Sequence, residues 1–327
     1  MASEKQTDIK IKGRGGKNLI LLLKIVLTII LLLYLRPAVK SDEILSAIKQ
    51  ADIIFILGAF ILILPNIYLQ FLKWEIICNK SLGEKDNKKI WRSLFYGYSG
   101  GIATPMKIGE YAGRLIVFKE KGILLVSLAT LIDKLFIFVM ITFSGSLAGI
   151  LFFQFYYGLS LTPALMLYTV VFLIYYLIFY FASKERFISQ GLVGRLMQKK
   201  YAGSFINGLR EFKTLGKETV TRLSLITIIL CTTYIMQFAM LVVAYSNHFN
   251  ILMYFWAGLL VMFAKTMIPP VTLGEFGVRE AASVIILKKM GLSSAIALNA
   301  SVTIFAFNLL LPAFIGLLMI LSRRDEL

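Results

Sequence analysis

The sequence has few of the residues that metal sites, disulfide frameworks and nucleophilic catalysis need. Among 327 residues it holds one histidine, His248, and two cysteines, Cys78 and Cys231. Two cysteines cannot build a disulfide framework, and their spacing matches no metal-ligand pattern. The glycines near Gly13 follow no strand, so they do not form a nucleotide-binding loop. We therefore expect no catalytic residues, no metal and no cofactor.

Charged residues are also scarce, at 16% of the chain, whereas hydrophobic residues make up 58%. Soluble domains are about 25% charged and about 45–50% apolar, so the polar residues here could not cover a water-facing surface. The 35 Lys and Arg nevertheless exceed the 18 Asp and Glu and give a net charge of +17. Such an excess fits nucleic acid or the cytoplasmic side of a bilayer. Nucleic acid is disfavoured, because no basic stretch comes with a separate soluble domain.

Several apolar runs are long enough to cross a membrane, which takes roughly 20 helical residues. They occupy residues 19–35, 53–72, 123–143, 164–181, 223–245 and 295–321. Residues 99–118 and 251–287 are apolar but interrupted by proline, glycine and charge. The stretch 144–155 fits either a short separate helix or an extension of the run before it. The predicted fold class is an all-α, polytopic membrane protein with about six to eight transmembrane helices and two re-entrant hairpins.

The chain is predicted to form one domain. A basic tail (1–18) precedes a single transmembrane domain (19–327), whose re-entrant hairpins span 93–120 and 251–290. The tail resembles the start of a signal peptide, but the apolar run after it can span and shows no cleavage site, so we expect a retained span. The hydrophilic segment 184–222 carries apolar residues at helical spacing, as in an amphipathic helix on a cytoplasmic leaflet.

The distribution of Lys and Arg predicts the orientation. With the N-terminus in the cytoplasm, 24 of the 35 basic residues fall in cytoplasmic segments, 5 in external segments and 6 inside apolar segments. Because cytoplasmic loops are enriched in Lys and Arg, we expect a protein of the cell membrane with both termini in the cytoplasm. The same assignment makes the two hairpins enter from opposite sides.

A short motif occurs twice, at positions 105–114 and 270–279. Both copies read Pro-x-x-x-Gly-Glu-[Tyr/Phe]-x-x-Arg, at an offset of 165 residues. Proline and glycine break regular helix, and irregular backbone at membrane depth must be buried in protein or line a cavity. The residues predicted to break the hairpins are Pro105, Gly109, Pro269, Pro270, Gly274 and Gly277. Two copies entering from opposite sides indicate an inverted-repeat transporter.

Ionisable residues within the apolar regions are the predicted binding residues. A charge at the bilayer centre costs roughly 2.5–3.5 kcal/mol on insertion scales, so such residues are expected to be paired and functional. Glu110 with Arg114, and Glu275 with Arg279, are four apart and can pair on one helix face. The predicted substrate-binding set is Lys107, Glu110, Arg114, Asp133, Lys134, Lys265, Glu275, Arg279 and Glu280.

Two further pairings are predicted. Asp133 and Lys134 are adjacent and cannot point the same way, so Asp133 is expected to meet Arg114 or Lys107. Glu280 is expected to meet Lys265 or Arg279.

A purely structural role is the alternative, in which the pairs only lock the hairpins together. For Glu110 and Arg114 both roles stay open. For Lys107, Arg279 and Glu280 a functional role is favoured, because small residues pack a structural hairpin more readily.

The motifs resemble one known family. The stretch Ala103-Thr104-Pro105-Met106-Lys107-Ile108-Gly109-Glu110 with Arg114, the stretch Ile132-Asp133-Lys134-Leu135, and the second motif from Pro269 to Glu280 are similar to those of the lysylphosphatidylglycerol synthase transmembrane-region family. That resemblance implies two re-entrant hairpins meeting in mid-membrane. It also implies flippase-like translocation of phospholipids, including aminoacylated ones, between leaflets.

Two positions depart from the family pattern and bear on head-group preference. Lys107 stands where arginine is common, and Glu275 stands where a second glycine is common. The chain also ends at Leu327, soon after its last apolar run, so synthase activity is not expected. The leading hypothesis is a lipid translocase that moves charged phospholipid or aminoacyl-phospholipid head groups.

The rival hypotheses are a membrane-embedded lipid-modifying enzyme, which could use Glu110 and Glu275 as acid and base, and an accessory subunit of a separate lipid synthase. The expected partners are membrane phospholipids. A separately encoded lipid synthase or glycosyltransferase and a second copy of the chain are further candidates, and nucleic acid is excluded.

Overall fold

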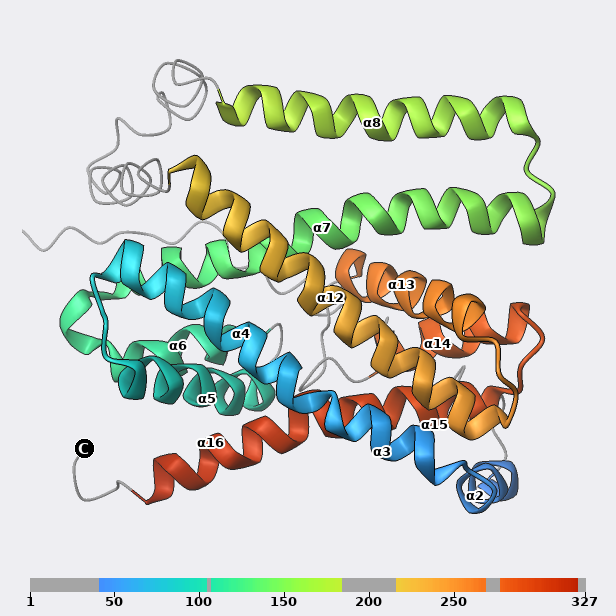
Figure 1. Cartoon of the computed structure of the whole chain (residues 1–327), viewed down its shortest axis with the longest axis horizontal. Helices are drawn as coiled ribbons and strands as arrows, with labels where there is room; N and C mark the ends of the chain where they lie inside the picture. The colour runs from blue at the N-terminus through green and yellow to red at the C-terminus, as the bar shows by residue number, and fades with distance from the viewer. Residues whose placement is uncertain (1–40, 105–106, 184–215, 269–276, 323–327) are drawn as a thin grey trace, which may run out of the picture.

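A computed structural model of the protein describes residues 41–104, 107–183, 216–268 and 277–322 (Figure 1). The first apolar run, most of the amphipathic segment, and the motif residues Pro105, Pro269, Pro270, Gly274 and Glu275 lie outside the described residues.

Regular structure in the described parts of the chain is helical throughout. The helices are α2 (Ser41–Lys49), α3 (Ile53–Ile61), α4 (Ile63–Ile77), α5 (Asn87–Ala103), α6 (Ile108–Val117), α7 (Ile123–Tyr157), α8 (Leu161–Ser183), α12 (Lys217–Ser246), α13 (Ile251–Met267), α14 (Val278–Lys289), α15 (Ser294–Phe305) and α16 (Leu311–Leu321). Two π-helical turns, Cys78–Leu82 and Ala306–Leu310, extend α4 and join α15 to α16. The all-α prediction is confirmed.

Among the residues that the structure describes, four helical segments are long and apolar enough to cross a membrane. They are Ile53–Leu82, Ile123–Tyr157, Lys217–Ser246 and Ser294–Leu321, and Leu161–Leu177 and Ile251–Met267 are shorter apolar helices. This composition is that of a polytopic membrane protein, as predicted. Because α7 is continuous to Tyr157, the stretch 144–155 is an extension of the preceding span and not a separate helix.

The first described span is longer than the sequence pattern suggested. We predicted its end at residue 72, but the helical segment continues to Leu82. Lys73, which the charge count assigned to a cytoplasmic loop, therefore lies within this segment and is only 1% exposed. That assignment was wrong, because a single lysine at the end of an apolar run looks the same in sequence whether it faces water or a buried carboxylate.

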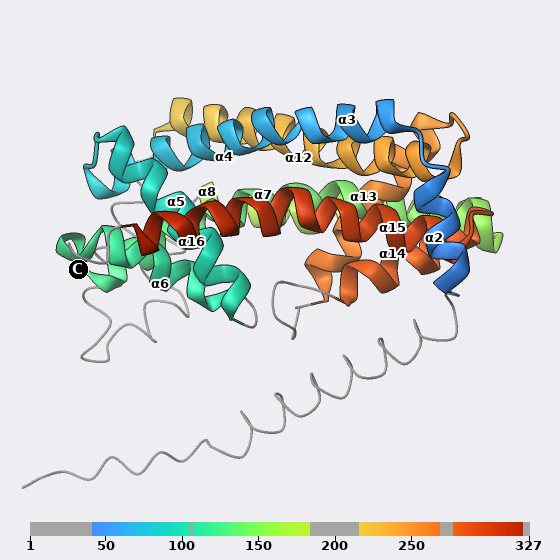
Figure 2. The same ribbon diagram turned by 90° about the horizontal axis from the view of Figure 1, so that it is seen from below.

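The two interrupted regions form helical hairpins that sit apart along the molecule. Figures 1 and 2 show α5 and α6 toward one end of the long axis, and α13 and α14 toward the other. Insertion of the two hairpins from opposite sides of the membrane stays a prediction.

Glycine allows the backbones of α5 and α6 to come close together. A Cβ atom at Gly100 would lie 2.1 Å from the carbonyl oxygen of Gly109, and one at Gly113 would lie 2.1 Å from the carbonyl oxygen of Tyr96. The hydroxyl of Thr104 accepts a hydrogen bond from the Gly109 N–H at 2.6 Å, which satisfies one of the unpaired donors at the start of α6. The first hairpin is therefore held by backbone contact that larger residues would prevent.

Replacing Gly100 should destabilise this hairpin. We expect Gly100→Ala to lower the stability of the protein by about 1–3 kcal/mol, because the added methyl meets backbone that cannot rotate away. Gly149→Ala is the matched control, since no atom lies within 4 Å of its Cβ position. Thermal unfolding in detergent can be followed with a thiol-reactive dye, because Cys78 and Cys231 are both buried in the folded protein. Equal unfolding temperatures for the two variants would contradict the expectation.

Candidate functional site

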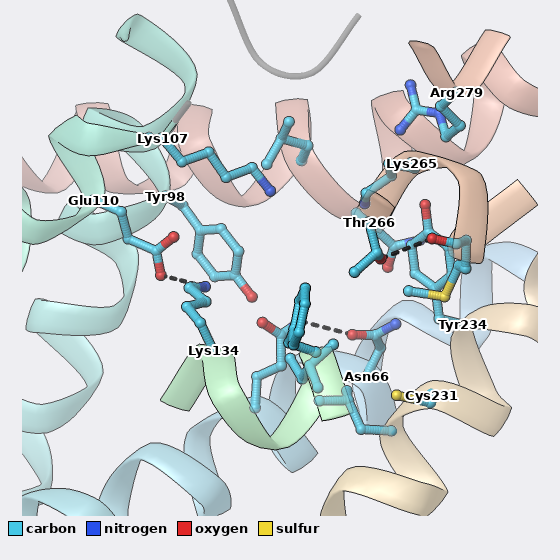
Figure 3. A pocket seen from close by; sticks show the side chains of 18 of the residues that line it. Asn66, Tyr98, Lys107, Glu110, Lys134, Cys231, Tyr234, Lys265, Thr266 and Arg279 are labelled. Carbon is cyan, nitrogen blue, oxygen red and sulfur yellow. Dashed lines mark hydrogen bonds and ion pairs between the residues drawn. The ribbon is translucent and has the colours of Figure 1, made fainter. Parts of the chain in front are cut away.

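Charged residues from both hairpins line one cavity in the interior of the molecule. Its volume is about 410 Å³, and Figure 3 shows it from close by. Five of the predicted residues line it: Lys107, Glu110, Lys134, Lys265 and Arg279. Lys107 precedes α6, Glu110 lies on α6, Lys134 on α7, Lys265 on α13 and Arg279 on α14. Charged residues up to 172 positions apart in sequence, from Lys107 to Arg279, therefore share one site.

Asp133 and Glu110 form a dense ion-pair cluster on one side of this cavity. Arg114 contacts both carboxylates, with Nη2 2.7 Å from Glu110 Oε1 and 2.9 Å from Asp133 Oδ2. Lys134 Nζ lies 2.7 Å from Glu110 Oε1, and Lys73 Nζ lies 2.9 Å from Asp133 Oδ1. The predicted pairs Glu110–Arg114 and Asp133–Arg114 are both present. Each of the two carboxylates contacts at least two cations.

Arg114 does not lie where a direct role in binding would place it. Its side chain is 2% exposed and is not part of the cavity lining, and its guanidinium carbon sits 3.9 Å from the centre of the Trp74 ring. The Trp74 indole N–H in turn donates to Ser93 Oγ at 2.8 Å. Arg114 is thus enclosed between an aromatic ring and two carboxylates, behind the cavity wall.

Lys73 is a member of this cluster that the sequence analysis missed. Its ammonium also donates to the backbone carbonyl of Asp133 at 2.8 Å, so it ties α4 to α7. The signal that could have found it was the presence of Asp133 in mid-span, which required cations on neighbouring helices. Lys73 lies one residue beyond the predicted end of the preceding span and was the nearest candidate in sequence.

The second hairpin carries its own charged pair. The guanidinium of Arg279 pairs with the carboxylate of Glu280, as predicted, and Arg279 Nε donates to Ser301 Oγ at 3.1 Å. The other oxygen of Glu280 accepts a hydrogen bond from the Gly277 N–H at 2.6 Å. Gly277 has φ of +106°, a conformation that favours glycine. Glu280 therefore both caps the start of α14 and positions Arg279.

Lys265 approaches the cavity from α13. Its ammonium lies 5.5 Å from the centre of the Tyr234 ring on α12, within the range of a cation–π contact. Figure 3 shows Lys265 and Arg279 on the same side of the cavity, opposite Lys107, Glu110 and Lys134. Cationic groups therefore face the cavity from both hairpins.

A network of side-chain amides lies beside the charged residues. Gln237 Oε1 accepts from Asn66 Nδ2 at 3.2 Å and from Asn308 Nδ2 at 3.0 Å, and Gln70 Nε2 donates to Asn66 Oδ1 at 2.8 Å. Asn66, Gln70 and Asn308 line the cavity, and Asn308 lies on the π-helical turn of the last span. These residues were not among the predicted ones, because they carry no charge. The amides of Asn66 and Gln70, four apart in an apolar run, were a usable signal.

Comparison with known protein families places the chain in one of them. The family model described as the lysylphosphatidylglycerol synthase TM region matches residues 21–316. The chain belongs to this family. The match spans both hairpins and every residue that lines the cavity. A comparison with curated proteins finds no match.

Membership of the lysylphosphatidylglycerol synthase TM-region family confirms the resemblance seen in the motifs and supports a membrane function related to lipids. In this member of the family, Lys107, Glu110, Lys134, Lys265 and Arg279 line the cavity. Asp133 and Glu280 are buried next to them, with exposed fractions of 4% and 0%. Of the predicted set, Glu275 lies outside the described residues.

Removal of Lys73 should destabilise this family member strongly. We expect Lys73→Met to cost about 3–5 kcal/mol of stability, because it leaves Asp133 buried with one cation fewer. Lys89→Met is the control: the exposed Lys89 pairs with Glu120 at 3.4 Å on the surface, and exposed ion pairs contribute little.

Denaturant or thermal unfolding in detergent measures both effects. Adding Asp133→Asn to Lys73→Met should cost less than the sum of the two single substitutions, because the two side chains act as a pair. Strict additivity would show that Lys73 does not stabilise the fold through Asp133.

Proposed function

We propose that this protein is a lipid translocase of the flippase-like kind. In this proposal the cavity holds the charged head group of a phospholipid while the acyl chains stay in the surrounding lipid. The observation that carries the proposal is the convergence of Lys107 and Glu110 from one hairpin and Lys265 and Arg279 from the other on one cavity. Charges at such depth are retained in membrane proteins mainly where they serve a transport path.

The two hairpins would act on the head group together. The positive ends of α6 and α14, at Ile108 and Val278, start next to the cavity, and helix N-termini favour phosphate. Lys107, Lys265 and Arg279 would supply full positive charge to the phosphate. Rocking of one hairpin and its neighbours against the other would then expose the cavity to each leaflet in turn, as in other inverted-repeat transporters. In this proposal the protein lies in the cell membrane with both termini in the cytoplasm.

The rival reading is a membrane-embedded lipid-modifying enzyme. It requires a carboxyl group that can exchange protons, and Glu110 was the candidate. In the structure Glu110 Oε1 lies 2.7 Å from both Arg114 and Lys134, an arrangement that favours a fixed carboxylate over a group that gains and loses a proton. Lipid profiles of cells with and without the gene separate the two hypotheses. A changed set of lipid species favours the enzyme, whereas unchanged species with altered outer-leaflet exposure favour the translocase.

Removal of a cavity cation should slow lipid translocation. We expect Lys265→Gln to lower the rate about tenfold or more, because a charge-assisted contact to phosphate contributes roughly 1.5–3 kcal/mol. The assay uses the purified protein in vesicles that carry a fluorescent phospholipid, with an impermeant quencher to report the lipid in the outer leaflet.

Lys89→Gln is the matched control, because Lys89 is an exposed surface lysine outside the cavity lining. Its rate should equal that of the unmodified protein. If Lys265→Gln, shown to be folded by size-exclusion chromatography, moved lipid at the unmodified rate, the cavity would not be the transport path.

A further inference from the structure

The cavity carries an excess of positive charge that the described acids do not balance. The residues that line it or form ion pairs with its lining, together with Lys73, comprise the cations Lys73, Lys107, Arg114, Lys134, Lys265 and Arg279 and the acids Glu110, Asp133 and Glu280. This is six positive against three negative groups. Even if Glu275 is counted as a fourth acid, the cations exceed the acids by two. Excess charge in apolar surroundings calls for a counter-ion.

The acids are also committed to cations of the protein itself. Glu110 contacts Arg114 and Lys134, Asp133 contacts Lys73 and Arg114, and Glu280 pairs with Arg279. A cationic head group would have to compete with guanidinium and ammonium groups at about 2.7–2.9 Å. It would also meet repulsion from Lys107 and Lys265 across the cavity. The balance of charge therefore disfavours an aminoacylated head group and favours an anionic one.

Two polar atoms at the cavity indicate a second chemical feature of the ligand, besides its charge. The hydroxyl of Tyr98 and the side-chain oxygen of Asn308 are buried, and neither has a hydrogen-bond partner among the described residues. Both residues line the cavity, and Figure 3 shows the Tyr98 hydroxyl directed toward its middle. Buried polar atoms without partners are uncommon in native proteins, so each of these two atoms calls for a hydrogen-bond partner that the described residues do not supply.

The Asn308 oxygen distinguishes between ligands. Its amide nitrogen donates to Gln237, which leaves the oxygen without a partner; an amide oxygen can only accept, and a phosphate diester has no proton to donate. A hydroxyl or an ammonium could donate to it, but the excess of cations disfavours ammonium. A hydroxyl group is therefore the donor that fits both observations. The volume of about 410 Å³ is within the range of small-molecule sites.

We propose that the head group accepted here is an anionic polyol phosphate, with a phosphate facing the cations and a free hydroxyl meeting Asn308 and Tyr98. This inference rests on the proposed translocase function and names its substrate class. It separates phosphoglycerol-type lipids from both zwitterionic and aminoacylated lipids.

Four phospholipids with identical acyl chains test the charge requirement in the vesicle assay. Phosphatidylglycerol is anionic with hydroxyls, phosphatidylmethanol is anionic without them, phosphatidylethanolamine is zwitterionic and lysyl-phosphatidylglycerol is cationic. We expect phosphatidylglycerol to move at least about tenfold faster than lysyl-phosphatidylglycerol, because unlike charge is favoured over like charge in the cavity. Equal or faster movement of the lysyl lipid would overturn the inference and leave the translocase intact.

The hydroxyl requirement is tested by Tyr98→Phe. The unmodified protein should prefer phosphatidylglycerol over phosphatidylmethanol about fivefold, the size expected of one or two hydrogen bonds. Tyr98→Phe should reduce that ratio severalfold while retaining the preference for anionic over lysyl lipid. Tyr68→Phe is the control, since Tyr68 is 54% exposed and outside the cavity lining. An unchanged ratio in Tyr98→Phe would show that Tyr98 bonds to water and would overturn the hydroxyl part of the inference.

Binding is measured separately from transport, so that the two proposals can fail independently. Native mass spectrometry of the purified protein with the same four lipids should show preferential retention of phosphatidylglycerol. If no lipid moves faster than in protein-free vesicles, the translocase proposal fails, while the retained lipid still decides the head-group class. Preferential retention of the lysyl lipid would overturn the inference by this route as well.

Discussion

The ion-pair cluster around Asp133 is the interaction on which the rest of the site depends. Asp133 lies on α7 and contacts Lys73 on α4 and Arg114 on α6, so one carboxylate joins two long spans to the first hairpin. Each of the three residues is at most 4% exposed. Removing any one charge would leave the others uncompensated in apolar surroundings, which is much more costly than losing a surface pair. The position of the hairpin therefore follows from electrostatics as well as from the close glycine contacts of α5 and α6.

Burial of Lys73 and Arg114 has a consequence for the cavity in front of them. These two cations engage Asp133 and Glu110 from behind, at 2.7–2.9 Å. The negative charge of the cluster is thus largely balanced by residues that a ligand does not reach. What faces the cavity is the lysine-rich side, with Lys134 and Lys107. The buried cations Lys73 and Arg114 balance the carboxylates and stabilise the fold. The lysines that line the cavity therefore give its surface a net positive charge.

Much of this arrangement was predictable from sequence, and the exceptions have physical reasons. The cost of buried charge predicted that Asp133 would meet Arg114 or Lys107, of which Arg114 is its partner, and the spacing of four predicted the pair of Arg114 with Glu110. Lys73 was missed because the charge count assigned it to the cytoplasmic loop after the apolar run 53–72. The amides around Gln237 were missed because they carry no charge, although neutral polar side chains in a span must also find partners. Hydropathy could not place the end of α7, because an apolar stretch fits one long helix or two short ones equally well.

The repeated motif was a good guide to where the site lies but a poor guide to what each residue does. Arg114 and Arg279 occupy the same position of the motif, yet Arg114 is enclosed between Trp74 and two carboxylates, while Arg279 lines the cavity. The two arginines are placed differently because each pairs with an acid at a different position in the sequence. Arg114 pairs with Glu110 one helical turn before it, whereas Arg279 pairs with its neighbour Glu280, which also caps α14 through Gly277. The two copies of the motif therefore place their arginines differently, and the acids around each arginine decide which one anchors the fold and which one lines the cavity.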